Sequence, residues 1–296
     1  MKASRHALLA VTLLASHAFA IDIEDVRAAW ETRERNAESY FYSLHTVDSP
    51  TKEMRDKPQA ERKPINDLFG EDTVETLSRS CQFSKTPLFY SYLSYGDVVD
   101  NFSGEIVKSK GVQTYDRKKK IERRSLHTWF SQKTLDQFDK PYLPSYQEKH
   151  SDDVPRHFIV GSNLLPIHFF HVPKQVLSAL GWKLGEIVPS DHVHLPDDES
   201  NLLKLKLTRG NDRWSSTVEV NPKLNYAPVK WTWLLDGKQV CEHVIEYRQH
   251  IRSDSERTAV QSFRITRPEK VLEAIVSEVR FDDEVLDSET SANIEN

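Results

Sequence analysis

The chain has 296 residues, of which 38% are hydrophobic, 10% aromatic and 29% charged, a balance typical of a packed globular protein. Its formal net charge of -5 argues against nucleic-acid binding, which depends on cations that neutralise phosphates. The nine glycines form neither a G-x-G-x-x-G pattern nor a P-loop, and no G-x-S-x-G elbow indicates a catalytic serine.

The first 20 residues have the order of a secretory signal peptide. Lys2 and Arg5 give a basic start, and residues 7–15 form an apolar run that is too short to span a bilayer. Ala18 and Ala20 then supply the A-x-A pattern before a cut. We therefore expect residues 1–20 to be removed and the protein to be exported, to the periplasm or outside the cell, as at most a peripheral membrane protein.

The mature chain opens with a predicted helix over residues 22–39, which Asp22 caps and whose charged side chains, including Arg33, are expected to face solvent. Alternating aromatic residues predict a strand over 38–47. Residues 48–67 combine three prolines with many charges, so we expect an exposed, mobile insertion, with a domain linker as the alternative.

The middle of the chain mixes two patterns. Residues 74–125 alternate repeatedly between polar and apolar side chains, which predicts strands with a hairpin turn at 116–118. Residues 126–138 are predicted as a helix and the rest of the stretch up to 170 as loop. Residues 171–182 are predicted as a second helix.

The C-terminal half has the clearest pattern. Residues 203–281 contain six alternating stretches with short turns and no helix between them, which predicts an antiparallel meander. We expect nine to eleven strands in all. The fold class is mainly β with α: a strongly curved antiparallel sheet, an open and incomplete β-barrel, covered by two or three helices. It forms a single domain over residues 21–281, and the acidic tail at 282–296 is expected to fray.

One hairpin in this meander gives a sharp prediction. Asp236-Gly237 is a strong signal for a two-residue turn. The resulting register places Trp231 and Trp233 on the face opposite Cys241 and His243.

Several short stretches carry a resemblance to known proteins. They are residues 26–30 (VRAAW), 112–118 (VQTYDRK) and the run from 220–222 (VNP) through 226–229 (YAPV) to 236–238 (DGK). The chain resembles exported bacterial proteins of the LolA/LolB type and the related sensor domain of RseB, including uncharacterised members. The resemblance implies an incompletely closed β-barrel covered by helices around an apolar cavity. It also implies lipid, lipoprotein or another envelope protein as partner; none of the family's functional residues has a match here.

An apolar ligand cavity is predicted on the inner face of the sheet, although the same residues also suit an ordinary core under a helix. The seven residues are Tyr40, Tyr42, Leu205, Leu207, Val218, Trp231 and Trp233.

The best candidate for a metal site is His192 with His194. Two imidazoles spaced two apart on a strand point the same way, and residues 197–199 offer carboxylates. The favoured interpretation is instead a polar loop fixed by Pro189 and Pro196, so no metal or other cofactor is predicted.

Two further features leave alternatives open. Cys81 and Cys241 either form a disulfide in an oxidising compartment or remain two buried thiols. The basic residues at 117–120 and 123–124 either meet acidic lipid head groups or, as the favoured interpretation, form the solvated end of a hairpin.

These patterns favour a non-enzymatic exported protein that holds an apolar ligand, such as an acyl chain, a lipoprotein or a lipid. One alternative is an exported hydrolase or metalloenzyme that uses His192 and His194. Another is a protein-interaction or sensor domain without a small ligand.

Overall fold

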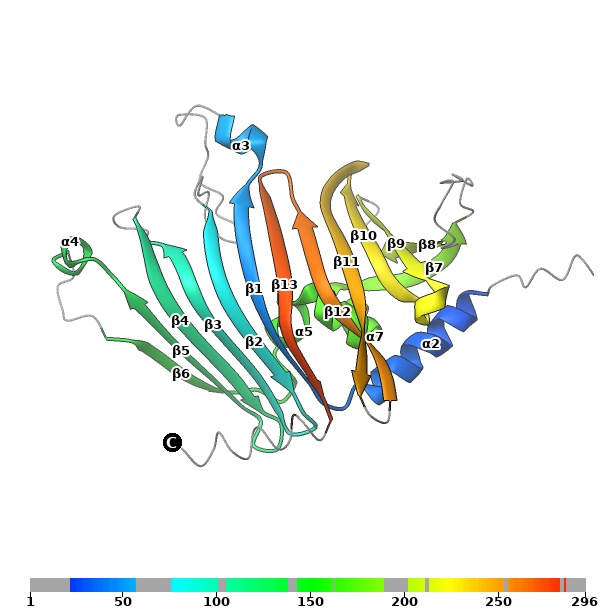
Figure 1. Cartoon of the computed structure of the whole chain (residues 1–296), viewed down its shortest axis with the longest axis horizontal. Helices are drawn as coiled ribbons and strands as arrows, with labels where there is room; N and C mark the ends of the chain where they lie inside the picture. Colours follow the sequence, from blue (N-terminus) through cyan, green and yellow to red (C-terminus); the bar gives the residue numbers. More distant parts are fainter. Residues whose placement is uncertain are drawn as a thin grey trace, which may run out of the picture.

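The computed structural model shows one large antiparallel sheet with helices on one face (Figure 1). The strand order is β6-β5-β4-β3-β2-β1-β13-β12-β11-β10-β9-β8-β7, and all twelve neighbouring pairs run antiparallel. The sheet is curved and unclosed, which confirms the predicted fold class. The structure describes residues 22–56, 76–100, 105–137, 143–161, 163–188, 202–210, 213–252, 255–282 and 285.

The first six strands run in chain order from the middle of the sheet to one edge. They are β1 (Tyr40–Pro50), β2 (Leu77–Lys85), β3 (Phe89–Val99), β4 (Ile106–Asp116), β5 (Ile121–Trp129) and β6 (Ser145–His150). We call β2–β6 the outer arm.

The remaining strands start at the opposite edge and return to the middle. They are β7 (Trp182–Val188), β8 (Leu203–Arg209), β9 (Trp214–Asn221), β10 (Ala227–Leu235), β11 (Lys238–Arg252), β12 (Ser255–Thr266) and β13 (Lys270–Phe281). We call β7–β12 the inner arm. Because β13 pairs with β1, the last strand of the sheet lies beside the first.

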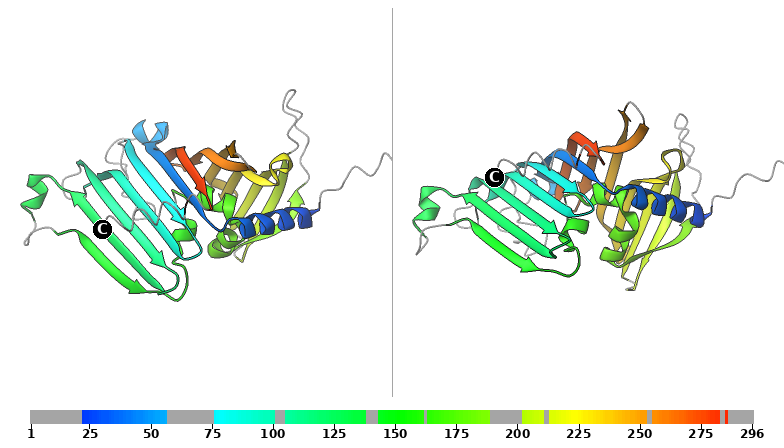
Figure 2. Two further views of the ribbon diagram at one scale, coloured as in Figure 1. Left: turned by 60° about the horizontal axis from the view of Figure 1, so that its bottom comes forward. Right: turned by 90° about the horizontal axis from the view of Figure 1, so that it is seen from below.

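Three short helices carry the chain from β6, at one edge, to β7, at the other. They are α5 (His157–Val160), α6 (Leu165–His171) and α7 (Pro173–Leu180), and α7 ends at Gly181 in the left-handed conformation that glycine favours. With α2 (Ile23–Asn36) they lie in the concavity between the two arms (Figure 2). Two smaller helices, α3 (Lys52–Asp56) and α4 (Gln132–Leu135), lie at the ends of β1 and β5.

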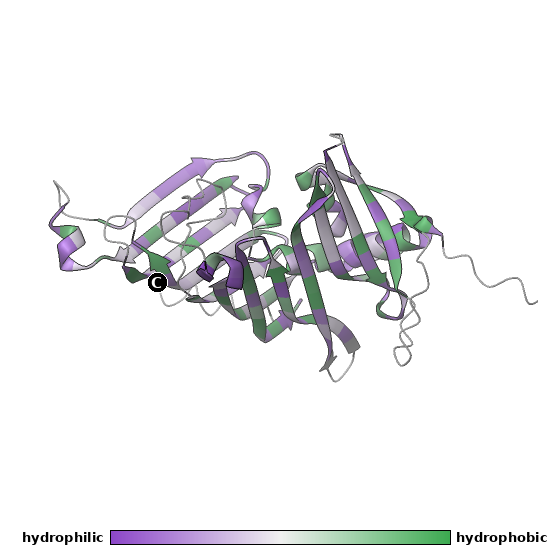
Figure 3. Cartoon of the chain, turned by 90° about the horizontal axis from the view of Figure 1, so that it is seen from above, coloured by the Kyte–Doolittle hydropathy of each residue, from purple (hydrophilic) through white to green (hydrophobic). Residues whose placement is uncertain are grey.

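Alternation along the strands explains the core. Apolar and polar side chains succeed one another along most strands (Figure 3), so one face of the sheet is apolar. This face and the helices bury two hydrophobic clusters. The first centres on Tyr40, Tyr42 and Phe83, and the second joins Trp30 and Phe169 to the inner arm. No helix among the described residues is long and apolar enough to cross a membrane.

Several predicted elements differ from the structure. Residues 126–129 complete β5 instead of starting a helix, because Leu126 pairs with Ser145 of the unpredicted edge strand β6. Residues 165–171 form α6 instead of loop, with Pro166 in its first turn, where the missing N–H costs nothing.

The predicted insertion at 48–67 also begins as regular structure. Asp48, Ser49 and Pro50 continue β1, and α3 follows. Pro50 is tolerated because it lies beyond the last pair between β1 and β2, which joins Asp48 to Leu77. The rest of that segment lies outside the described residues, as do most of the predicted signal peptide and tail.

The predicted face of the tryptophan hairpin is wrong. Leu235 pairs with Lys238 around the expected two-residue turn, but the register shifts by one residue between Trp233 and Leu234. Such a β-bulge reverses the faces of all later residues. Trp231 consequently lies opposite His243, and Trp233 opposite Cys241, on the same buried face.

Both cysteines are free and buried. Cys81 lies on β2 and Cys241 on β11, with β1, β13 and β12 between them in the sheet. Neighbouring strands lie about 4.8 Å apart, whereas a disulfide needs its Cα atoms within about 7 Å. The structure therefore has the two thiols and no bridge between them.

Candidate functional site

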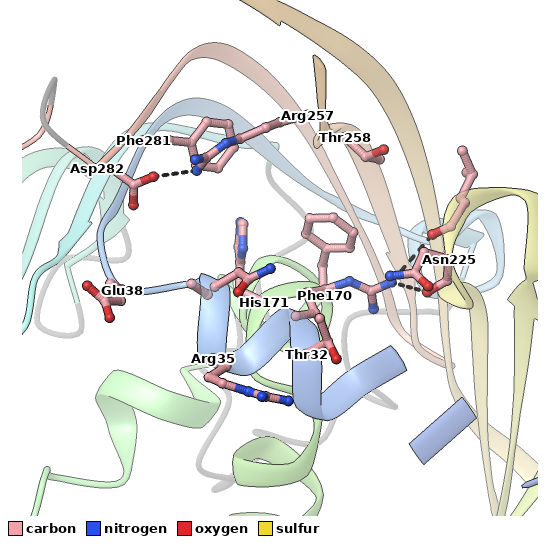
Figure 4. A pocket seen from close by; sticks show the side chains of 14 residues that line it. Thr32, Arg35, Glu38, Phe170, His171, Asn225, Arg257, Thr258, Phe281 and Asp282 are labelled. Carbon is pink, nitrogen blue, oxygen red and sulfur yellow. Dashed lines mark hydrogen bonds and ion pairs between the residues drawn. The ribbon is translucent and has the colours of Figure 1, made fainter. Parts of the chain in front are cut away.

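The pocket between α2 and the sheet is the candidate functional site, and we call it the α2 pocket. Its volume of about 550 Å³ falls in the range of roughly 300–1,000 Å³ typical of small-molecule sites. The end of α2 forms one wall, and the ends of α6, β12 and β13 form the others (Figure 4).

A turn with unusual backbone conformation fixes one wall. Residues 222–224 form a short 3-10 helix after β9, capped by Asn221, whose side chain accepts from the backbone N–H of Lys223 at 2.9 Å. Asn225 and Tyr226 then both adopt positive φ, at 52° and 56°. The turn thereby directs several carbonyl groups toward α2.

Helix α2 is held against this turn by two side chains. The Trp30 indole Nε1 donates to the carbonyl of Tyr226 at 2.9 Å. The Arg33 Nη2 donates to the carbonyl oxygens of Leu224 and Asn225. Arg33 is therefore half-buried at the pocket wall, which corrects the prediction that it faces solvent.

Arg33 has an unsatisfied donor in this wall. Its Nη1 is buried without a hydrogen-bond partner, and its guanidinium lies 4.9 Å from the centre of the Phe170 ring. No carboxylate among the described residues forms an ion pair with it. Burial lowers the pKa of Arg33 to about 10, so the group is still charged at neutral pH. A buried, charged donor without a partner is costly, which suits an anionic ligand at this point.

Aromatic rings form the floor of the pocket. Phe170, His171 and Phe281 lie there, and the rings of His171 and Phe281 meet edge-on with centroids 5.9 Å apart. Arg257 lies over the Phe281 ring and pairs with Asp282 at 2.6 Å, so its charge is already compensated (Figure 4). The pocket thus combines an apolar floor with the uncompensated charge of Arg33.

His171 joins this floor to the buried core. Its Nε2 lies 2.8 Å from the Tyr42 hydroxyl, and its ring stacks on Tyr40 at 4.2 Å between centroids. Burial, followed by the nearby charges of Lys85 and Arg33, lowers the pKa of His171 well below its ordinary value. The imidazole is therefore neutral, and it forms the layer between the pocket and the two tyrosines.

The seven residues predicted to line an apolar cavity lie on the concave face, where helix side chains cover them. Tyr40 and Tyr42 belong to the first cluster; Leu205, Leu207, Val218 and Trp231 belong to the second; Trp233 contacts both. Phe169 of α6, for example, stacks on Trp231 with centroids 4.3 Å apart. None of the seven lines the α2 pocket or either of two further pockets, one beside Phe158 and one beside Trp182.

The remaining candidates lie elsewhere. His192 and His194 fall outside the described residues, and within those residues no three His, Cys, Asp or Glu side chains gather as a metal site requires. Cys241 Sγ lies 3.1 Å from His243 Nε2, but burial raises the pKa of the thiol. This pair therefore lacks the thiolate character of a nucleophile.

Sequence reasoning missed the residues of the α2 pocket. Arg33 was assigned to the solvent face because helical spacing alone does not show which turn packs beside a helix. Phe170 follows Phe169 in a stretch predicted as loop, and Phe281 is the last residue of the last predicted strand. One sequence signal could have located the wall of the pocket. It is Asn225-Tyr226 after the proline turn, because asparagine readily adopts positive φ.

Comparisons with known proteins leave the family open. No family model matches the chain, and no curated protein matches it. Among solved structures, a domain from Vibrio parahaemolyticus that is named for outer membrane lipoprotein sorting aligns over 88% of this chain and 92% of its own. The identity is 9% and the TM-score 0.42, so nothing about the function of this chain follows from the likeness.

Proposed function

We propose that the protein is an exported, non-enzymatic binding protein that holds an amphiphile, with an acyl chain and an anionic head group, between α2 and the curved sheet. The observation that carries this proposal is the buried, unpartnered Nη1 of Arg33 beside the aromatic floor of the α2 pocket. A carboxylate or phosphate satisfies this donor, and a hydrocarbon chain suits the rings of Phe170 and Phe281.

The seven predicted cavity residues form the second part of this proposal. A chain that displaces His171 from the pocket floor reaches Tyr40 and Tyr42 directly, because the imidazole contacts both. Each buried CH₂ group contributes about 0.8 kcal/mol, which favours insertion of a chain over binding of a head group alone. The helices then act as a cover that the ligand displaces.

The test is titration of the purified protein with a fluorescent fatty acid and with its methyl ester. We expect a dissociation constant on the order of 1 μM for the acid. Arg33→Gln should weaken binding of the acid by about tenfold, since a hydrogen bond to a charged group contributes roughly 1.5–3 kcal/mol. Binding of the ester should change little.

Two further variants separate charge from folding. Arg33→Lys keeps the charge and should retain most of the affinity for the acid. Arg264→Gln, on an exposed residue paired with Glu273, serves as the matched control and should bind like the wild type. Absence of uptake by a wild type that unfolds cooperatively would overturn the proposal.

A second function, a protein-interaction or sensor domain without a small ligand, is favoured by one observation. Helix side chains such as Phe169 fill the space over the inner arm. Failure of the wild type to take up either probe would support this alternative. The metalloenzyme alternative stays a prediction, and one zinc per chain that is lost in His192→Ala would support it.

A further inference from the structure

Two turns at one end of the outer arm bring apolar and cationic side chains together. The β2–β3 turn exposes Pro87, Leu88 and Phe89, with 54% of Leu88 and 39% of Phe89 accessible to solvent. The β4–β5 turn beside it exposes residues 117–120 (RKKK). We call these two turns the basic tip.

Hydrogen bonds fix the conformation of the two turns that form the basic tip. The Thr86 hydroxyl accepts from the backbone N–H groups of Leu88 and Phe89, at 3.3 and 2.9 Å. Arg117 joins the two turns, since its backbone N–H donates to the carbonyl of Leu88 and its Nη1 donates to that of Pro87. Leu88 is therefore held outward beside the cations.

The acidic groups near the tip only partly offset this charge. Asp116 is buried, accepts from the backbone N–H of Lys119 and lies 3.9 Å from its Nζ. Asp152 pairs with Lys120 at 2.9 Å, and Asp153 is exposed close by. Arg117 and Lys118 are exposed and have no ion pair among the described residues.

The tip belongs to an arm that differs from the rest of the chain. Residues 77–150 contain 13 Lys and Arg against 8 Asp and Glu, whereas the remainder contains 27 against 37. Eight of the ten exposed large apolar side chains among the described residues lie at positions 88–146. A positive, apolar arm on an acidic protein is the pattern of a surface that meets an anionic partner.

We propose that the basic tip docks the protein onto an anionic lipid bilayer. Its apolar side chains project from convex turns flanked by lysines, which suits insertion at the boundary between head groups and acyl chains. No residue of the tip lines the α2 pocket or the two other pockets, beside Phe158 and Trp182, so the tip presents projecting side chains where a peptide would need a groove.

The tip and the α2 pocket lie at the same end of the strands. Phe281, which lines the pocket, pairs with Tyr40; Tyr40 pairs with Lys85; and Lys85 is next to the β2–β3 turn. Both features thus lie along the lower edge of the sheet in Figure 1. Docking at the tip brings the mouth of the pocket toward the bilayer, a consequence that rests on the proposed function.

The experiment is co-sedimentation of the purified protein with phosphatidylcholine vesicles, with and without phosphatidylglycerol. We expect binding only to the anionic vesicles, and weaker binding at high salt. Lys118→Glu/Lys119→Glu should reduce binding by about tenfold or more, and Leu88→Ser by about threefold. Lys206→Glu/Lys238→Glu and Ile275→Ser, which change exposed residues outside the outer arm, are the matched controls and should bind like the wild type.

Equal binding of tip and control variants would overturn the proposal, as would equal binding to neutral vesicles or none to either. The variants also separate this proposal from the proposed function. Lys118→Glu/Lys119→Glu should take up the fluorescent fatty acid from solution normally, whereas Arg33→Gln should bind vesicles normally.

Discussion

The inner and outer arms have similar sequence patterns but differ in what covers them. Both alternate polar and apolar residues along antiparallel strands. On the inner arm, residues such as Leu205, Leu207 and Trp231 are fully buried beneath α6 and α7. On the outer arm, Leu126 lies on the helix-facing side of the sheet and is 48% exposed, and Trp129 and Tyr146, on the other face, are 46% and 63% exposed.

Chain topology explains this difference. The helices that join β6 to β7 cross the concavity and end beside the inner arm, so they cover the strands that follow them. Among the described residues, α5 reaches β5 only near its first residues, where His157 lies against Glu122 and Arg124, so Leu126 further along the same face stays exposed. Alternation therefore determines which residues share a face, and the path of the connecting helices determines which face becomes core.

The largest expected effect is the difference in stability loss between two tryptophan replacements, one on each arm. Trp231→Ala should lower the free energy of unfolding by about 3–5 kcal/mol, because the ring is buried, stacks on Phe169 and donates to Ser216 Oγ. Trp129→Ala, at a position 46% exposed, should cost under about 1 kcal/mol. Urea unfolding measures both, and equal losses would contradict the difference between the arms.

Acid should destabilise the helix-covered region first. Burial lowers the pKa of His168 and of His243 to about 3, from 6.5. The unfolded chain therefore binds more protons below about pH 6.5, so stability falls as pH drops from there toward 3, by up to roughly 1.4 kcal/mol per pH unit for each histidine.

Tryptophan fluorescence can locate this effect. Trp129 is the only one of the six tryptophans that lies on the outer arm, so Trp129→Phe leaves a signal from α2 and the inner arm. In this background, His168→Leu should make the unfolding midpoint depend less steeply on pH between about pH 6 and 4. An unchanged slope would show that His168 is not the group responsible.

A close backbone contact at Gly96 should make the stability of the outer arm sensitive to any side chain added at that position. A Cβ at Gly96 would lie 2.3 Å from the Ser78 carbonyl oxygen and 2.5 Å from the Arg79 Cα. Gly96→Ala should therefore cost about 1–3 kcal/mol of unfolding free energy. A Cβ at Gly111 would meet two side chains and no backbone, with Ser94 Oγ at 3.0 Å and Leu126 Cδ1 at 3.8 Å, so Gly111→Ala is the control. A thermal scan that ranks the two variants in reverse order would contradict this assignment.

The smallest effect is expected at the edge of the outer arm. Arg123 pairs with Glu148 across β5 and β6 at 2.8 Å, and the two side chains are 41% and 46% exposed. Water and salt screen such a pair, so Arg123→Gln should leave the urea midpoint unchanged within error. A clear loss of stability would mean that the exposed edge depends on this contact.

Much of the fold could be predicted from local pattern. The alternation of polar and apolar residues predicted the antiparallel sheet, and the capping residue Asp22 predicted the start of α2. The bulge beside Trp233 could not be predicted, because a one-residue register shift depends on packing across strands. Helix α6 was missed because Pro166 suggested loop, although proline is favoured in the first turn of a helix.

The site was less accessible to sequence reasoning. The apolar cavity residues were chosen for hydrophobicity, a property that buried core shares. The α2 pocket instead depends on Arg33, whose unpartnered nitrogen results from contacts between residues about 190 positions apart. No local window contains that information.

Native mass spectrometry of protein purified from cells that express the full chain tests the central claim most directly. We predict a wild-type species that carries the added mass of one acyl amphiphile with an acidic head group. Arg33→Gln should appear mainly as the unliganded chain, and Arg264→Gln should match the wild type. An unliganded wild type that also fails to gain mass when mixed with a fatty acid would contradict the account.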